Sequence, residues 1–243
     1  MTPVLEVSRL QHTYRDAPVL RNVDLVVNRG EFVALIGANG SGKTTLLRCV
    51  AGLMRPRAGT VRVDGIDVAA DPARAKAKLG FAIEPQKLPP LLTGRECIRL
   101  FAEARGLDQA PPDAFELAQK LALTPMLEQA VAHYSLGTRQ KLGIVLGLLG
   151  RPPLLILDES LNGLDPMSAY ALKNHLQHLT RDFGTAVILA THSLDVAERY
   201  ITKAVLLMDG SVFRAWSAEE ILMIRGDPAR SLEQEMVNAL KAT

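Results

Sequence analysis

A glycine-rich segment near the start of the chain carries the residue types that bind the phosphates of a nucleoside triphosphate. Residues 37–44 read Gly-Ala-Asn-Gly-Ser-Gly-Lys-Thr and match G-x-x-x-x-G-K-[ST]. In this pattern backbone N–H groups converge on a phosphate, the lysine reaches the β- and γ-oxygens, and the hydroxyl after it ligates Mg²⁺. An apolar run precedes the segment and a helix-forming run follows it, as the pattern requires. We expect the nucleotide to contact Gly37, Asn39, Gly40, Ser41, Gly42, Lys43, Thr44 and Thr45.

A second chemical signal is a pair of carboxylates that ends an apolar run. Residues 154–157 are four aliphatic side chains, followed by Asp158 and Glu159. A strand this apolar belongs in the centre of a sheet, so its acidic end emerges where the phosphate loop also begins. We expect Asp158 to serve Mg²⁺ and Glu159 to take a proton from, or orient, an attacking water. The alternative is a solvated acidic pair with no chemical role.

The elements that must position these groups alternate along the chain. Short strands are predicted at 4–7, 23–27, 31–36 and 60–63, the last entering a hairpin turn. After about residue 154, predicted strands at 154–157, 186–190 and 204–208 alternate with helices at 166–180 and 194–199. This alternation predicts an α/β fold with a mostly parallel sheet. Residues 93–150 have helical spacing, with helices at 95–104 and 113–123, and read as an inserted helical segment.

Composition excludes several classes of protein. Lys and Arg number 28 against 26 Asp and Glu, so a charge of +2 gives no reason to expect a nucleic acid partner. The longest apolar stretch, 142–150, is less than half of the ~20 residues that a membrane span needs, and the first residues lack a signal peptide pattern. We expect a cytoplasmic chain whose membrane role would need a partner. Cys49 and Cys97 are expected to fill core space.

Three further segments resemble motifs of the ATP-binding cassette (ABC) ATPases and occur in that family's order. Residues 134–142, Tyr-Ser-Leu-Gly-Thr-Arg-Gln-Lys-Leu, resemble the signature sequence. Residues 162–165 are similar to the D-loop, and 190–193 to the switch-histidine segment. Tyr14 stands where the family has its adenine-stacking aromatic residue. The resemblance covers about residues 3–215.

The resemblance implies a fold, cofactors and roles. The fold would be a P-loop NTPase of ABC type, one domain over 1–243 with a central mostly parallel sheet flanked by helices. It would add an N-terminal antiparallel β-subdomain and the inserted helical subdomain. ATP and Mg²⁺ would bind between two subunits, with Ser135 and Gly137 touching the γ-phosphate of the opposite site. Glu159 would be the general base, His192 the γ-phosphate sensor, and Asp165 would communicate across the dimer.

The sequence departs from the family pattern at three places. Leu136 and Thr138 replace the usual glycine and glutamine of the signature, while Ser135 and Gly137 are kept. Ser-Leu replaces Pro-Thr after Glu159. The glutamine of the Q-loop falls on Glu84 in register, with Gln86 two residues later. Either side chain is a candidate to approach Mg²⁺ and the attacking water, and the alternative is that both are plain loop residues.

Residues 92–96, Leu-Thr-Gly-Arg-Glu, resemble the ABC-2 type exporter branch of the family. The resemblance implies an ATPase subunit that docks on a separate integral membrane permease at the inner face of the membrane. The second ATP-binding subunit would be a copy of this chain or a relative. The alternatives are an ABC importer ATPase, against which the short C-terminal tail argues, and a soluble ABC ATPase acting as a mechanical switch.

Weaker signals lie in the second half of the chain. His175 and His178 are spaced i, i+3 on a predicted helix and are interpreted as a half-buried or solvated face rather than a metal site. Trp216 is expected to anchor the tail from about 217 to 243. Ser217 and Asp227 are predicted to cap two helices of that tail, the second running to about residue 241.

Overall fold

A four-stranded antiparallel sheet forms one layer of the protein. The structure, a computed structural model, describes residues 3–15, 17–192, 199–227 and 229–241. The strands lie in the order β2-β1-β4-β5. Their bounds are β1 Pro3–Tyr14, β2 Ala17–Asn28, β4 Ala58–Val63 and β5 Ile66–Asp67. β1 and β2 are longer than predicted because left-handed residues at Arg9 and Asn22 shift the register and break the alternation that marks a strand.

A six-stranded sheet forms the second layer and carries the predicted parallel core. Its order is β10-β9-β3-β8-β7-β6, with only the edge strand β10 antiparallel to its neighbour. The bounds are β3 Phe32–Ile36, β6 Leu79–Phe81, β7 Leu154–Asp158, β8 Ala186–Thr191, β9 Lys203–Met208 and β10 Ser211–Trp216. The predicted strands at 31–36, 154–157, 186–190 and 204–208 are thus confirmed, whereas β6 was not predicted.

The parallel strands are buried on both faces, which is why they read as continuous apolar runs. In β3, Phe32, Ala34 and Ile36 pack into the core under the helices, while Val33 and Leu35 face the core shared with the antiparallel sheet. Helix α1, Lys43–Val50, lies between the two sheets and contributes Leu46, Leu47 and Cys49 to the second core. Both Cys49 and Cys97 are buried free thiols, as expected.

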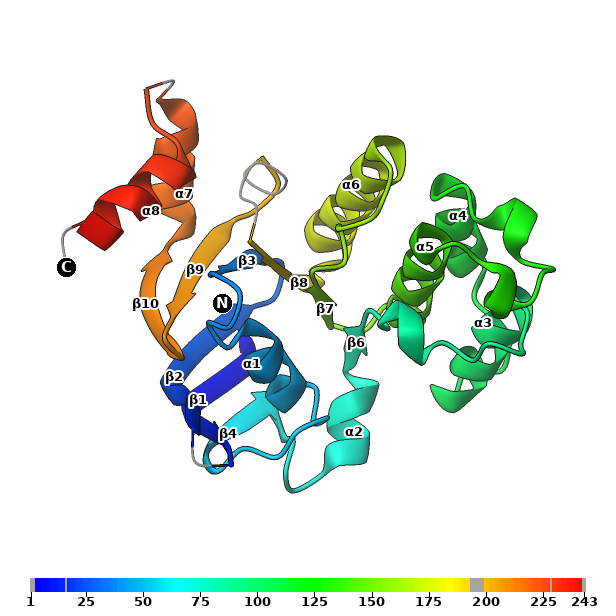
Figure 1. Cartoon of the computed structure of the whole chain (residues 1–243), viewed down its shortest axis with the longest axis horizontal. Helices are drawn as coiled ribbons and strands as arrows, with labels where there is room; N and C mark the ends of the chain where they lie inside the picture. Colours follow the sequence, from blue (N-terminus) through cyan, green and yellow to red (C-terminus); the bar gives the residue numbers. More distant parts are fainter. Residues whose placement is uncertain (1–2, 16, 193–198, 228, 242–243) are drawn as a thin grey trace.

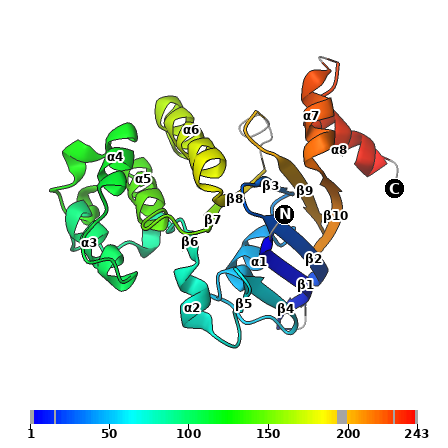
Figure 2. The ribbon, with the colours of Figure 1, turned by 180° about the vertical axis from the view of Figure 1, so that it is seen from behind.

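The inserted helical segment forms a lobe at one end of the molecule (Figures 1 and 2). It contains α3 Gly94–Ala104, α4 Pro112–Lys120 and α5 Leu136–Gly147, with short 3-10 helices η2 Thr124–Met126 and η3 Val131–His133. Outside it lie α2 Pro72–Ala77, η1 Pro85–Lys87 and α6 Pro166–Phe183. The helix predicted at 194–199 falls almost wholly outside the described residues.

Helix α5 joins the lobe to the sheet by direct backbone contact. Ile83 donates its N–H to the carbonyl of Gly143 at 3.0 Å, and a Cβ at Gly143 would meet the Ile83 carbonyl oxygen at 2.1 Å. A Cβ at Gly80 would approach the Gly147 carbonyl oxygen to 2.0 Å. Only glycine permits these close backbone approaches. They allow α5 to pack directly on β6 and on the loop that follows it.

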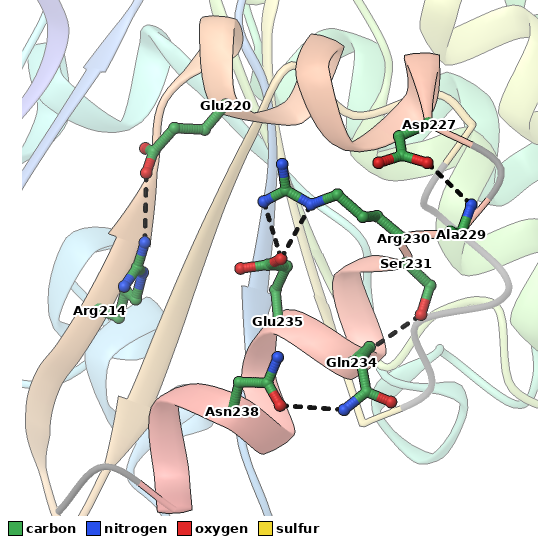
Figure 3. A network of polar contacts seen from close by, with 9 residues as sticks. All are labelled: Arg214, Glu220, Asp227, Ala229, Arg230, Ser231, Gln234, Glu235 and Asn238. Carbon is green, nitrogen blue, oxygen red and sulfur yellow. Dashed lines mark hydrogen bonds and ion pairs between the residues drawn. The ribbon is translucent and has the colours of Figure 1, made fainter.

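The tail folds as two helices, α7 Ala218–Gly226 and α8 Leu232–Lys241. Ser217 caps α7 through a reciprocal capping box with Glu220, as predicted, and the buried Trp216 anchors its start. Figure 3 shows Arg230 facing Glu235 across the turn and Arg214 of β10 facing Glu220. The predicted second cap was wrong: Asp227 accepts from Ala229 N–H in the turn, and Ser231, which accepts from Gln234 N–H, directly precedes α8.

Across the described part of the chain, every helix is too short or too polar to cross a lipid bilayer.

Candidate functional site

The predicted chemical groups meet at one edge of the six-stranded sheet. Strands β3, β8, β7 and β6 are adjacent and parallel, so their carboxyl ends face the same way. The phosphate loop follows β3, His192 follows β8, Glu159 follows β7, and Glu84 follows β6 within three residues. Ligands of open α/β sheets bind at this edge, where the strand order reverses.

The phosphate loop wraps around the amine of Lys43. Its Nζ donates to the Gly37 carbonyl oxygen at 2.6 Å and to that of Ala38 at 3.2 Å. Gly42 has φ 105°, and a Cβ at Gly37 would meet the Leu207 carbonyl oxygen at 2.4 Å, so both positions require glycine. Asn39 and Gly40 form the exposed tip, while Ser41 and Thr45 are buried. Lys43 is itself buried, which leaves a positive charge at the first turn of α1.

Thr44 and Asp158 supply an oxygen set that suits a hard divalent cation. Burial raises the pKa of Asp158, an effect that the nearby Thr44 hydroxyl partly offsets. The Oδ1 atom of Asp158 is buried and has no hydrogen-bond partner among the described residues. A buried, unpartnered carboxylate oxygen beside a hydroxyl is costly unless a cation or water completes it. The two side chains therefore fit Mg²⁺, which prefers oxygen ligands.

Glu159 lies between His192 and Lys43. His192 Nδ1 is 3.0 Å from Glu159 Oε2, and Lys43 Nζ is 3.8 Å from Glu159 Oε1. Glu159 has φ 50°, a left-handed conformation that is uncommon for a residue with a Cβ. Its N–H donates to the Ala190 carbonyl at the end of β8, which ties the turn to the neighbouring strand. The structure thus places Glu159 within reach of both other predicted residues, Lys43 and His192.

Glu84 is held by two cations. Its Oε1 accepts from Arg48 of α1 at 2.8 Å and from Lys87 of η1 at 2.7 Å. These two partners lower the pKa of the Glu84 carboxyl, Lys87 first, against the opposing effect of burial. Gln86 is exposed on η1, and its one side-chain hydrogen bond among the described residues is to Glu84, at 3.4 Å. Arg48 therefore links Glu84 to the helix that begins at the phosphate loop.

Tyr14 stands at the end of β1 with 46% of its surface exposed. Its hydroxyl lies 3.4 Å from the Met54 sulfur, and the His12 ring meets it edge-on at 5.1 Å. These two contacts hold the ring while leaving nearly half of it accessible. An accessible aromatic ring of this kind can stack on a base.

The signature residues Ser135 and Gly137 lie at the start of α5. Ser135 caps the helix by accepting from Thr138 N–H at 3.1 Å. Within the described residues neither one hydrogen-bonds to the phosphate loop of the same chain. Asp165 caps α6 and pairs with Lys141 of α5 at 2.8 Å; Lys141 first, and then Ser168, lower the pKa of its carboxyl. Leu136, at the family's glycine position, is 69% exposed.

Sequence reasoning missed three residues that organise the site: Arg48, Lys141 and Asn162. Arg48 of α1 pairs with Glu84 in the loop after β6. This contact arises because α1 packs against the sheet, so the sequence around Arg48 does not reveal it. Lys141 and Asn162 connect the segment 160–165 to α5 and to Glu159. Residues 141 and 162 lie within the recognised motifs, but no sequence pattern predicts which side chains they contact.

His175 and His178 lie on one helix, α6, as their spacing predicts. Burial, with the nearby Lys120 next, lowers the pKa of His175 to about 4, while His178 pairs with Asp182 on the same helix. His175 is half-buried and His178 is exposed, in keeping with the half-buried or solvated face expected from the sequence.

Comparison with known proteins agrees with this geometry. The family model described as ABC transporter matches residues 20–162. The chain is 35% identical over 210 residues to YdbJ of Bacillus subtilis, named as an uncharacterized ABC transporter ATP-binding protein, covering 86% of this chain and 68% of that protein. It is 36% identical to the lipoprotein-releasing system ATP-binding protein LolD 2 of Caulobacter vibrioides, over 86% of this chain and 96% of that protein.

Solved structures show the same similarity. An ATP-binding subunit of an ABC transporter superposes with a TM-score of 0.87 at 36% identity, covering 98% of this chain and 99% of that one. A dimeric ATP-binding cassette in a post-hydrolysis state, bound to ADP and Pi, superposes with a TM-score of 0.78 at 26% identity, covering 88% and 98%.

Proposed function

The chain belongs to the ABC transporter family as an ATP-binding subunit with ATPase activity, and we propose that it drives export through a separate membrane permease. The observation that carries the proposal is the meeting of Lys43, Glu159 and His192 at the carboxyl ends of three adjacent strands. Phosphoryl transfer to water needs positioned charge and a base at one point, and this cluster supplies both.

ATP would bind along the phosphate loop, with its adenine stacked on Tyr14. The amine of Lys43 would exchange the carbonyls of Gly37 and Ala38 for phosphate oxygens, which carry more negative charge. Glu159 would accept a proton from water as the water oxygen bonds to the γ-phosphorus. The bond from that phosphorus to the β,γ-bridging oxygen breaks, and ADP and phosphate leave. His192 would contact the γ-phosphate in this arrangement.

Thr44 and Asp158 would hold Mg²⁺, with Glu84 as the Q-loop residue. When bound, the ion would neutralise phosphate charge. Glu84 stands in the family register and is tied to α1, whereas in the described part of the chain the Gln86 side chain hydrogen-bonds to Glu84 alone. We therefore assign the Q-loop role to Glu84.

Each ATP would be completed by a second subunit. Ser135 and Gly137 lie on a helix that seats on β6, and their hydrogen bonds stay within the lobe. Their N-terminal position on α5 suits a phosphate arriving from outside the chain. The dimeric relative with ADP and Pi supports this arrangement. Since this chain has every motif, a homodimer would contain two equivalent sites.

The subunit would work at the inner face of the membrane, peripheral to an integral permease that selects the cargo. The segment 92–96, which resembles the ABC-2 type exporters, starts α3 of the lobe. We propose that residues 1–243 act as one ATPase domain whose lobe, about 93–150, presents the signature, and whose tail from 217 caps the core. Importer and soluble-switch functions are the competing assignments.

Co-purification from native membranes tests the assignment. The chain is recovered with a gentle detergent, and its companions are identified by mass spectrometry. We expect a stoichiometric polytopic membrane protein that has no cassette of its own. Recovery alone, or with ribosomal or DNA-repair proteins, would contradict the transport role, and a permease with a substrate-binding protein would indicate an importer.

A further inference from the structure

Asn162 makes a contact with Glu159 that the motifs do not assign. Its side-chain Nδ2 donates to Glu159 Oε2 at 3.0 Å, and its backbone N–H donates to the Glu159 carbonyl at 3.1 Å. One residue therefore holds both the backbone and the side chain of Glu159. A left-handed glutamate persists only where its surroundings impose the conformation, and Asn162 is part of those surroundings.

The two oxygens of the Glu159 carboxylate have different surroundings. Oε2 has two ring or amide nitrogens at 3.0 Å, from Asn162 and His192. Oε1 is buried and has no hydrogen-bond partner in the described part of the chain, with Lys43 Nζ at 3.8 Å. The carboxylate is thus anchored through one oxygen, and the other keeps its lone pairs free on the side of the phosphate loop.

The segment that carries Asn162 is fixed to the signature helix. Gln140 of α5 donates to the Ser160 carbonyl at 3.2 Å, and Lys141 of α5 pairs with Asp165. Between these two attachments, a Cβ on Gly137 would lie 3.0 Å from the Gly163 carbonyl oxygen. The segment 160–165 therefore packs on α5 along its length, and Asn162 has a defined position from which to hold Glu159.

We propose that Asn162 is a positioning residue for ATP hydrolysis, whose amide fixes Glu159 so that Oε1 takes the proton of the attacking water. The inference rests on the proposed role of Glu159. Oε1 gains the proton, the water oxygen bonds to the γ-phosphorus, and the bond to the β,γ-bridging oxygen breaks to release ADP. Asn162 touches neither water nor phosphate and acts only through Glu159.

Two variants of the purified full-length chain test the proposal. Asn162→Asp keeps the size and shape of the side chain but replaces the N–H donor with an oxygen that repels Glu159. Asn162→Ala removes the donor without adding charge, and both keep the backbone N–H that closes the turn. Asn238→Asp, in α8, is the matched control for an added negative charge. The measurements are kcat, affinity for a non-hydrolysed ATP analogue, and melting temperature.

We expect kcat to fall about 10- to 100-fold in Asn162→Ala, and further in Asn162→Asp, as a hydrogen bond to a charged group is lost. Analogue affinity should stay within about twofold, because no phosphate contact changes. Asn238→Asp should match the native chain. A kcat within about twofold in both Asn162 variants would overturn the proposal. A loss of kcat accompanied by an equal fold-loss of analogue affinity would also overturn it. So would a loss of kcat accompanied by a clear fall in melting temperature.

A parallel assay of Glu159→Gln distinguishes failure of the positioning role of Asn162 from failure of the base role of Glu159. If Glu159→Gln is inactive while the Asn162 variants keep full kcat, only the positioning role fails. If Glu159→Gln keeps its activity, the base assignment fails, and the role of Asn162 fails with it.

Discussion

At the scale of single residues, the chemistry of this chain depends on a few side chains. The sequence predicts the roles of some of them, whereas the roles of others follow only from contacts in the fold. Lys43, Thr44, Asp158 and Glu159 belong to contiguous motifs, and the structure brings them together at one sheet edge as expected. Arg48 and Asn162 could not be assigned because their roles arise from contacts with Glu84, 36 residues away, and with the side-chain oxygen of Glu159. A motif gives the type of a residue but not its neighbours across the fold.

Tyr14→Ala should weaken ATP affinity about 5- to 150-fold, because stacking of an aromatic ring on a base contributes about 1–3 kcal/mol. The chemical step should change less. Tyr14→Phe is the matched control, since it keeps the ring and loses only the hydroxyl contact with Met54. Titration with a fluorescent ATP analogue measures the affinity. Equal affinity in the native and Ala chains would mean that another group holds the adenine.

Glu84→Ala and Gln86→Ala distinguish the two candidates for the Q-loop role. Glu84→Ala should lower kcat on the order of tenfold or more, because a group placed near the attacking water is lost and Arg48 is released. Gln86→Ala should remain within about twofold of the native rate, as its described side-chain contact is with Glu84 alone. Steady-state ATPase assays at saturating Mg²⁺ decide the matter. The reverse ranking would move the role to Gln86.

At the scale of elements, buried apolar strands were the most predictable part of the fold and irregular elements the least. β3, β7, β8 and β9 appear within two residues of their predicted bounds because burial on both faces makes them continuous apolar runs. β1 and β2 were predicted as short pieces because bulges interrupt their alternation. β6 has only three residues, and its place next to β7 depends on glycine contacts with α5 that no local pattern reveals.

The packing of α6 against the helical lobe predicts a pH dependence of stability. Burial lowers the pKa of His175 to about 4, so the folded chain binds fewer protons there than the unfolded chain between about pH 4 and 6.5. Stability should therefore rise with pH through this window. Allowing for partial exposure, we expect the residue to reduce the free energy of unfolding by about 1 kcal/mol between pH 7 and 5.

His175→Gln should lose this part of the pH dependence, because the glutamine does not titrate. Urea unfolding at pH 7 and pH 5 of both chains gives the difference. The groups that set the His175 environment, chiefly Lys120, His178, Asp113 and Arg151, stay in place in the variant and so cancel in the comparison. The same pH dependence in both chains would contradict a buried neutral His175.

At the scale of the whole molecule, the order of motifs identifies the family from sequence, and the superposition on solved cassettes agrees over 98% of the chain. In the proposed assembly, the second half of each ATP site comes from a second chain. Ser135 and Gly137 were named through the resemblance alone; in the structure Ser135 caps α5, and Gly137 packs against Gly163 in the segment 160–165. Their partner phosphate, and the permease that the lobe would engage, would belong to that proposed assembly.

The assembly of two chains around ATP is the central claim, and Glu159→Gln tests it most directly by light scattering with Mg²⁺ and ATP, with ADP as the control. The variant should hydrolyse ATP at least about 100-fold more slowly while keeping its affinity. Its mass should double from that of the 26.4 kDa chain with ATP and stay single with ADP. A variant that stays monomeric with bound ATP, or that hydrolyses ATP at the native rate, would contradict the account.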